Sequence, residues 1–115
     1  MPSPGQIAVF PFPHTDLSSG KLRPCLLLGK LPGSYRDWLV CMLSTQLRHY
    51  VLDFDEIVQA TDPDFAKSGL KAASVIRIGR LAVVDEAMLL GATGEIGPER
   101  LQRIRMRLAD WLRAS

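Results

Sequence analysis

Short apolar runs separated by proline, glycine and polar residues make up the first two thirds of the chain. Apolar runs of about four to eight residues are typical of strands, and short turns leave no room for the long crossovers that join parallel strands. The first run, residues 6–10, alternates roughly with period two and ends before Pro11 and Pro13, which cannot donate to a central ladder. The spacing therefore predicts an antiparallel sheet.

Further strands are predicted by the later apolar runs. These are residues 22–28, 38–43, 74–78 and 80–84. Pro32 and Gly33 give strong turn chemistry between the first two, which predicts a hairpin. Gly79 lies between the last two and predicts a bulge or kink. Residues 50–57 mix β-forming and acidic side chains and predict an edge strand.

A single long helix is predicted over residues 98–113, because Pro98 follows Gly97 at its start and an apolar stripe follows at helical spacing. The stripe consists of Leu101, Ile104, Leu108, Trp111 and Leu112. The opposite face carries Arg100, Arg103 and Arg107. These arginines form either a solvated face, with Arg103 paired to Glu99, or a stripe that binds nucleic acid, and the solvated face is favoured.

Shorter elements complete the prediction. A short helix is expected over residues 61–69, with Pro63 at its first position and Gly69 as its stop. One more helical turn is expected over residues 85–90, and the glycine-rich residues 91–97 are interpreted as a flexible connector. Together these elements predict an α+β fold in which an antiparallel sheet curls into a small barrel with helices packed on it.

Charge is distributed unevenly along the chain. Residues 98–115 hold five arginines against Glu99 and Asp110, which leaves nine cations and ten anions in the rest of the chain. A strong positive field over the whole surface is therefore excluded. If the protein binds nucleic acid, it does so in a local groove.

Several enzyme classes are excluded by missing residue patterns. The chain has no GxxxxGK[ST] phosphate loop, no HExxH and only two histidines, His14 and His49, so neither a metal nor another cofactor is expected. Cys25 and Cys41 lie in apolar runs and are expected to be reduced core residues. Because the N-terminus carries no secretion signal, a cytoplasmic location is expected.

Arg23 stands where a polar loop, residues 14–21, gives way to an apolar strand. Pro24 restricts Arg23 to an extended conformation. A guanidinium keeps its charge and presents a planar fork that fits phosphate oxygens. Arg23 is therefore either a side chain that reaches into solvent at the strand edge or a ligand for phosphate.

The second strand of the predicted hairpin also ends in polar residues. These are Ser44, Thr45 and Gln46. If the two strands are neighbours, the hydroxyls lie near Arg23 at one end of the sheet, where they either bond local backbone groups or join a polar site. Arg77, on a later strand, either joins this cluster or pairs with Asp85 or Glu86.

Three stretches of the chain resemble the PemK/MazF family of type II toxin–antitoxin toxins. They are GQIAVFPFPHTDLSSGKLRPCLLL, WLVCMLSTQ and SGLKAASVIRIGRLAVVDEAML. Members of that family have a K-x-R-P motif at the start of the second strand and a threonine or serine at the end of the next. The resemblance covers nearly the whole chain and implies one toxin domain over residues 1–115, with an SH3-like barrel shared by PemK, MazF and CcdB proteins.

The resemblance also implies an activity. Such a protein would be a homodimeric endoribonuclease that cleaves single-stranded RNA, including mRNA, without a metal and is held inactive by a cognate antitoxin. Attack by the ribose 2′-hydroxyl would give a 2′,3′-cyclic phosphate and a 5′-hydroxyl. By position, the family's arginine falls on Arg23, which would stabilise charge on the phosphate, and its threonine falls on Ser44, with Thr45 as the rival assignment.

The remaining candidates carry no single assigned role. Further residues for catalysis or RNA binding are His14, Asp16, Lys21, Gln46 and Arg77. His14 and Asp16 are the candidates for the general base. Some relatives place an aspartate two residues after an arginine on a later strand, but Gly79 stands at that position after Arg77. A carboxylate base is therefore not expected on that strand.

Two alternatives keep the barrel without the ribonuclease. CcdB-like toxins share the fold and poison a gyrase through a C-terminal tryptophan, whereas Trp111 lies on the apolar stripe of the predicted helix and is interpreted as a core residue. The other alternative is a barrel that binds nucleic acid but does not cleave it.

Overall fold

The computed structural model describes residues 2–11 and 22–115. Its strands are β1 (Gln6–Pro11), β2 (Leu22–Lys30), β3 (Asp37–Ser44), β4 (Glu56–Val58), β5 (Ser74–Asp85) and β6 (Gly91–Glu95). Its helices are α1 (Phe65–Ser68) and α2 (Pro98–Ala114), with single 3-10 turns η1 (Leu47–His49) and η2 (Glu86–Met88). The strands form one sheet in the order β4-β5-β3-β2-β1-β6, and every neighbouring pair is antiparallel.

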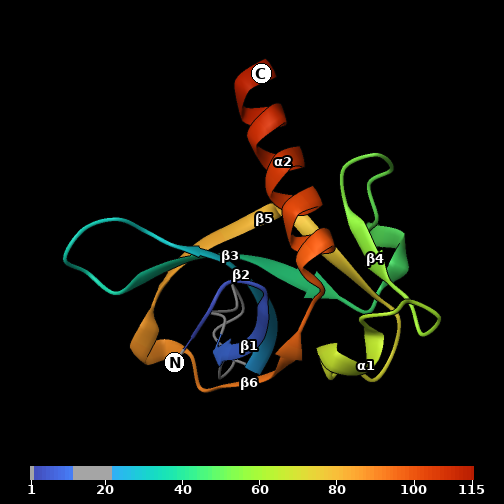
Figure 1. Ribbon diagram of the computed structural model, residues 1–115, viewed down its shortest axis with the longest axis horizontal. Coiled ribbons are helices and arrows are strands. Elements are labelled where there is room, and N and C mark those ends of the chain that lie inside the picture. The colour runs from blue at the N-terminus through green and yellow to red at the C-terminus, as the bar shows by residue number, and fades with distance from the viewer. Residues whose placement is uncertain (1, 12–21) are drawn as a thin grey trace, which may run out of the picture.

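The sheet curls into a half-barrel with α2 lying across it (Figure 1). This arrangement confirms the predicted α+β class and the antiparallel sheet. β2 and β3 form the expected hairpin, with Cys25 opposite Met42. β5 is one strand rather than two, but its pairing with β3 shifts between Cys41 and Met42, which leaves residues 78–80 as a bulge. The bulge predicted at Gly79 is therefore confirmed.

Alternating side chains along the strands build two apolar cores. The core between the sheet and α2 contains Ile7, Leu26, Leu28, Cys41, Leu43, Ile76, Ile78, Ile104 and Leu108. The core on the other face contains Ala8, Phe10, Cys25, Leu27, Trp38, Val40, Met42 and Val84. Cys25 and Cys41 are free and buried, as predicted. Burial raises the pKa of the Cys25 thiol to about 12, so this sulfur is held as the unreactive thiol.

The interpretation of residues 91–97 as a flexible connector is wrong, because residues 91–95 form β6 and pair with β1. Glycine is needed here for close approach. A Cβ added at Gly94 would collide with the backbone of Lys67 and Ser68, and one added at Gly69 would collide with the backbone of Thr93. β6 therefore packs directly on α1, where Thr93 Oγ1 donates to the Ser68 carbonyl at 3.1 Å.

The predicted short helix begins later than expected. α1 starts at Phe65 and ends at Ser68, followed by Gly69, whose φ of 71° is left-handed as a glycine stop requires. The expected start at Pro63 is wrong because Asp62 and Asp64 make longer-range contacts: both carboxylates bind Arg100. The predicted edge strand is also shorter than expected, since only residues 56–58 pair with β5.

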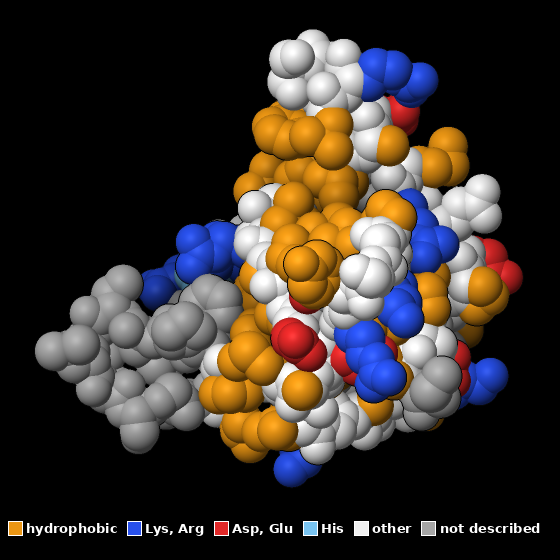
Figure 2. All heavy atoms as spheres, turned by 90° about the vertical axis from the view of Figure 1, so that its left-hand side faces the viewer, with side chains coloured by type: hydrophobic (Ala, Val, Ile, Leu, Met, Phe, Trp, Pro, Cys, Tyr) orange, Lys and Arg blue, Asp and Glu red, His pale blue; other side chains and the backbone are white. Residues whose placement is uncertain are grey.

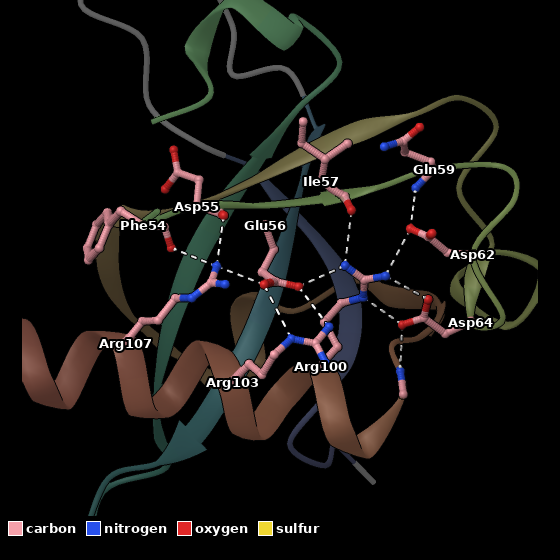
Figure 3. Close-up of polar contacts among 11 residues, drawn as sticks. Phe54, Asp55, Glu56, Ile57, Gln59, Asp62, Asp64, Arg100, Arg103 and Arg107 are labelled. Carbon is pink, nitrogen blue, oxygen red and sulfur yellow. Dashed lines mark hydrogen bonds and ion pairs between the residues drawn. The ribbon is translucent and has the colours of Figure 1, made fainter. Parts of the chain in front are cut away.

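Arg100 shows that the prediction of a solvated arginine face on α2 is wrong (Figure 3). This side chain is buried and donates to Glu56 at 2.9 Å, to Asp62 at 3.0 Å and to Asp64 at 2.8 Å. Arg103 pairs with Glu56 rather than with Glu99. The arginine face of α2 therefore fastens the helix to β4 and to the segment before α1.

Arg107 completes this cluster, with its guanidinium 2.8 Å from the Glu56 carboxylate. The carboxylate of Glu56 thus contacts three guanidiniums from successive turns of one helix. These three arginines are engaged by protein groups, which argues against the alternative of a stripe for nucleic acid.

The end of α2 differs from its prediction as well. Trp111 and Leu112 are 52% and 59% exposed, so the interpretation of Trp111 as a core residue is wrong. The C-terminal end of α2 extends beyond the sheet (Figure 1). The ring of Trp111 lies 6.3 Å from that of Phe54. Among the described residues, neither helix has the length and hydropathy to cross a membrane.

Candidate active site

The β2–β3–β5 pairing brings Arg23, Ser44 and Arg77 to one end and one face of the sheet. Arg23 lies two residues before Cys25 and therefore shares its face, which is the face away from α2. Ser44 lies two residues after Met42, the partner of Cys25, and so points the same way. Arg77 is opposite Met42 in the β3–β5 ladder.

A cleft of about 500 Å³ opens at this position. Its polar lining consists of Arg23, Ser44, Thr45, Gln46, His49, Lys71, Ser74, Arg77 and Arg80. Four of these side chains are cationic, and no Asp or Glu within residues 2–11 and 22–115 lines the cleft. Such a cleft is a place where positive potential is focused.

The cations of the cleft, unlike those of α2, have no counter-ions among residues 2–11 and 22–115. Arg23, Lys71, Arg77 and Arg80 make no side-chain hydrogen bond or ion pair with another described residue. Arg77 directly precedes the bulge at residues 78–80 and Arg80 is its last residue, and both line the cleft. Like charges left together without partners are destabilising unless an anion joins them. The pairing of Arg77 with Asp85 or Glu86 is not found, because Asp85 caps η2 and Glu86 accepts from Trp38.

Ser44 and His49 form a hydrogen-bonded couple in the cleft. Ser44 Oγ lies 3.0 Å from His49 Nδ1 and also accepts from the backbone N–H of Gln46 at 3.0 Å. The local-backbone interpretation of Ser44 is thus correct for one of its bonds, and the histidine takes the other. The turn η1, residues 47–49, carries His49 back toward the end of β3.

The surroundings of His49 favour its neutral form. Partial burial lowers the pKa of the imidazole below its ordinary value, and the positive charge of Arg77 lowers it further. Arg48 and Arg80 act in the same direction. His49 is therefore held as a neutral imidazole among cations, which is the form that can accept a proton.

The structure brings together most of the residues predicted for the site. Arg23, Ser44, Thr45, Gln46 and Arg77 all line the cleft. His14, Asp16 and Lys21 lie outside the described residues. His49, Lys71 and Arg80 were missed by the sequence reasoning. A histidine five residues after the serine that ends a strand is only a weak signal of a shared site. The turn at residues 47–49, which brings His49 to Ser44, is visible only in the structure.

The groups of this cleft have the chemistry to bind an anion and to move a proton. A guanidinium fork and a hydroxyl suit phosphate oxygens, and a neutral imidazole can move a proton. Within the described chain, no group of three or more His, Cys, Asp or Glu side chains is placed to hold a metal ion. The chain matches the family model for the PemK-like, MazF-like toxin of type II toxin–antitoxin systems over residues 3–112. It belongs to this family, and a cognate antitoxin is therefore its partner.

Comparison with curated protein sequences gives no match.

Proposed function

We propose that this toxin is an endoribonuclease that cleaves single-stranded RNA, including mRNA, in the cytoplasm and without a metal. The main support for the proposal is the cleft, where Ser44 and His49 are hydrogen-bonded and four cations have no partner in the part of the chain that the structure describes. Family membership supports it, because the match extends over residues 3–112 and so includes every element of the cleft.

The reaction would be attack of a ribose 2′-hydroxyl on the adjacent phosphorus. It needs in-line positioning and stabilisation of charge on the phosphate oxygens. Arg23 would hold two of these oxygens with its fork, and Ser44 would donate its hydroxyl proton to one of them. Arg77 and Arg80 would hold neighbouring phosphates of the strand. The products would be a 2′,3′-cyclic phosphate and a 5′-hydroxyl.

Incubation with a long RNA in EDTA tests the proposal. We expect cleavage at discrete sites, with 5′-hydroxyl ends, at a rate that EDTA does not change. Intact RNA together with gyrase-dependent breaks in DNA would instead support the CcdB-like alternative. This alternative is tested because Trp111, near the end of α2, is exposed.

We expect the antitoxin to block the cleft. An acidic, partly disordered segment would place carboxylates on Arg23 and its neighbouring cations, where phosphates would otherwise bind. Adding a saturating amount of the cognate antitoxin should therefore abolish RNA cleavage and exclude RNA from the complex. Full cleavage by the saturated complex would contradict this prediction.

We also expect the toxin to be a homodimer. An apolar groove of about 260 Å³ lies between α2 and the β2–β3 hairpin, lined by Leu28, Leu31, Leu39, Leu108 and Leu112 among others. Figure 2 shows hydrophobic side chains gathered along one side of the C-terminal half of α2. Apolar patches of this kind need cover, and a second copy supplies it. Light scattering at micromolar concentration should give twice the 12.7 kDa chain mass; the mass of a single chain would contradict the prediction.

A further inference from the structure

We propose that His49 is the general base of the reaction, with its Nε2 taking the proton of the attacking 2′-hydroxyl while its Nδ1–H donates to Ser44 Oγ. This inference rests on the proposed ribonuclease function and assigns the one role that the sequence leaves without a residue. The loop candidates His14 and Asp16 are the rivals.

The hydrogen bonds of Ser44 are compatible with this tautomer. A serine hydroxyl has two acceptor lone pairs and one proton to donate. The backbone N–H of Gln46 occupies one lone pair at 3.0 Å, and His49 Nδ1 lies 3.0 Å from the same oxygen. If Nδ1–H donates to the second lone pair, the hydroxyl proton of Ser44 is free to bind a phosphate oxygen. A neutral imidazole protonated at Nδ1 then has its basic lone pair on Nε2.

No other described group in the cleft can take this role. The charged side chains that line it beside His49 are Arg23 and Lys71 together with Arg77 and Arg80 on β5, and Arg48 adjoins it on its own turn. All of these are cations, and Gly79 leaves β5 without a carboxylate here. The same cations favour neutral His49, so the base is unprotonated at neutral pH.

The proposed step balances without a co-reactant other than water. The 2′-hydroxyl loses its proton to Nε2, the bond from O2′ to phosphorus forms, and the bond from phosphorus to O5′ breaks. A guanidinium keeps its protons in proteins, so the leaving 5′ oxygen takes its proton from water. His49 then returns its proton to solvent, and the enzyme is restored.

The pH profile of single-turnover cleavage tests the assignment. For the parent, we expect the rate to fall as the pH drops through a pKa below the ordinary histidine value of about 6.5, because protonated Nε2 is no longer a base. His49→Ala and His49→Gln should cleave roughly a hundred- to ten-thousandfold more slowly, and their rates should not show this fall at low pH. Added imidazole should restore part of the rate of His49→Ala.

Controls separate catalysis from folding and binding. Both variants should melt at the parent temperature and bind the 2′-O-methyl form of the cut oligonucleotide within about twofold of the parent. The cleavage rate of His14→Ala should still fall at low pH, as that of the parent does. If both His49 variants still lose rate at low pH, or if His14→Ala no longer does, His49 is not the general base. Cleavage by the parent would in that case still support the proposed function. A parent that cleaves no RNA would overturn both proposals.

Discussion

Replacing Arg23 with alanine is expected to slow single-turnover RNA cleavage about a hundred- to a thousandfold and to leave thermal melting unchanged. The range corresponds to about 2.7–4 kcal/mol, typical of losing one preorganised donor to a developing anion. Melting should not change because the Arg23 side chain is exposed and makes no hydrogen bond or ion pair with the described residues. Arg23→Lys should recover little, since a point charge does not reproduce the bidentate fork.

Arg36 provides the matched control for this experiment. Its side chain is 76% exposed, it precedes β3 at the end away from Ser44, and it only approaches Glu86 at 4.0 Å. Arg36→Ala removes the same charge and should cleave at the parent rate. If Arg23→Ala also stays within a few-fold of the parent, Arg23 is a solvent-exposed strand residue and the site assignment is wrong.

Replacing Arg100 with alanine is expected to lower the free energy of unfolding by about 3–5 kcal/mol, because it leaves the largely buried Asp64 carboxylate without its guanidinium and removes one of the three that contact Glu56. Glu56, 8% exposed in its side chain, and Asp64, 11% exposed, would each lose a guanidinium within 3 Å. A domain of this size is stable by about 5–15 kcal/mol, so the loss is large. Urea unfolding followed by circular dichroism measures it.

Two arginines of the same helix serve as controls for Arg100. Arg103 contacts Glu56 but is 50% exposed, and Arg113 is 81% exposed and pairs with Asp110. Because exposed pairs are screened by water, each substitution to alanine should cost at most about 1 kcal/mol. Equal losses for Arg100→Ala and Arg113→Ala would show that the buried cluster does not stabilise the fold.

The same cluster makes stability depend on pH in a defined direction. The hydrogen bond from Arg100 lowers the pKa of Asp64 below its ordinary value. The resulting stabilisation is fully present above the ordinary pKa of an aspartate, about 3.9, and is lost as the pH falls through the lowered value. Arg100→Ala removes the main cause of the shift, so its stability should fall less steeply in acid than that of the parent.

Local patterns were enough to predict the strands, the hairpin and the position of α2. The apolar runs of β1, β2 and β3 are short, and Pro98 opens α2 where the sequence places it. Such signals depend only on neighbours in the chain. They also placed Arg23 and Ser44 at one end of the hairpin, because antiparallel pairing fixes which ends meet.

Contacts between distant residues could not be predicted in the same way. Arg100 and Glu56 are 44 positions apart. The charged face of the helix predicts exposure to solvent, and the helical pattern contains no sign of the distant segment that covers it. β6 was missed because Gly94 allows its close packing on α1 instead of marking a loop. His49 was missed because the turn that returns it to Ser44 has no apolar periodicity.

We propose that the cleft around Arg23 and Ser44 promotes attack by a ribose 2′-hydroxyl. The most direct test compares two oligonucleotides with one cut site, identical except for a single 2′-deoxy nucleotide on the 5′ side of the scissile phosphate. In EDTA, the parent protein is expected to cut the all-ribose strand to a 2′,3′-cyclic phosphate and a 5′-hydroxyl and to leave the substituted strand intact. Cleavage of the substituted strand at the same bond, or products with a 3′-hydroxyl, would contradict it.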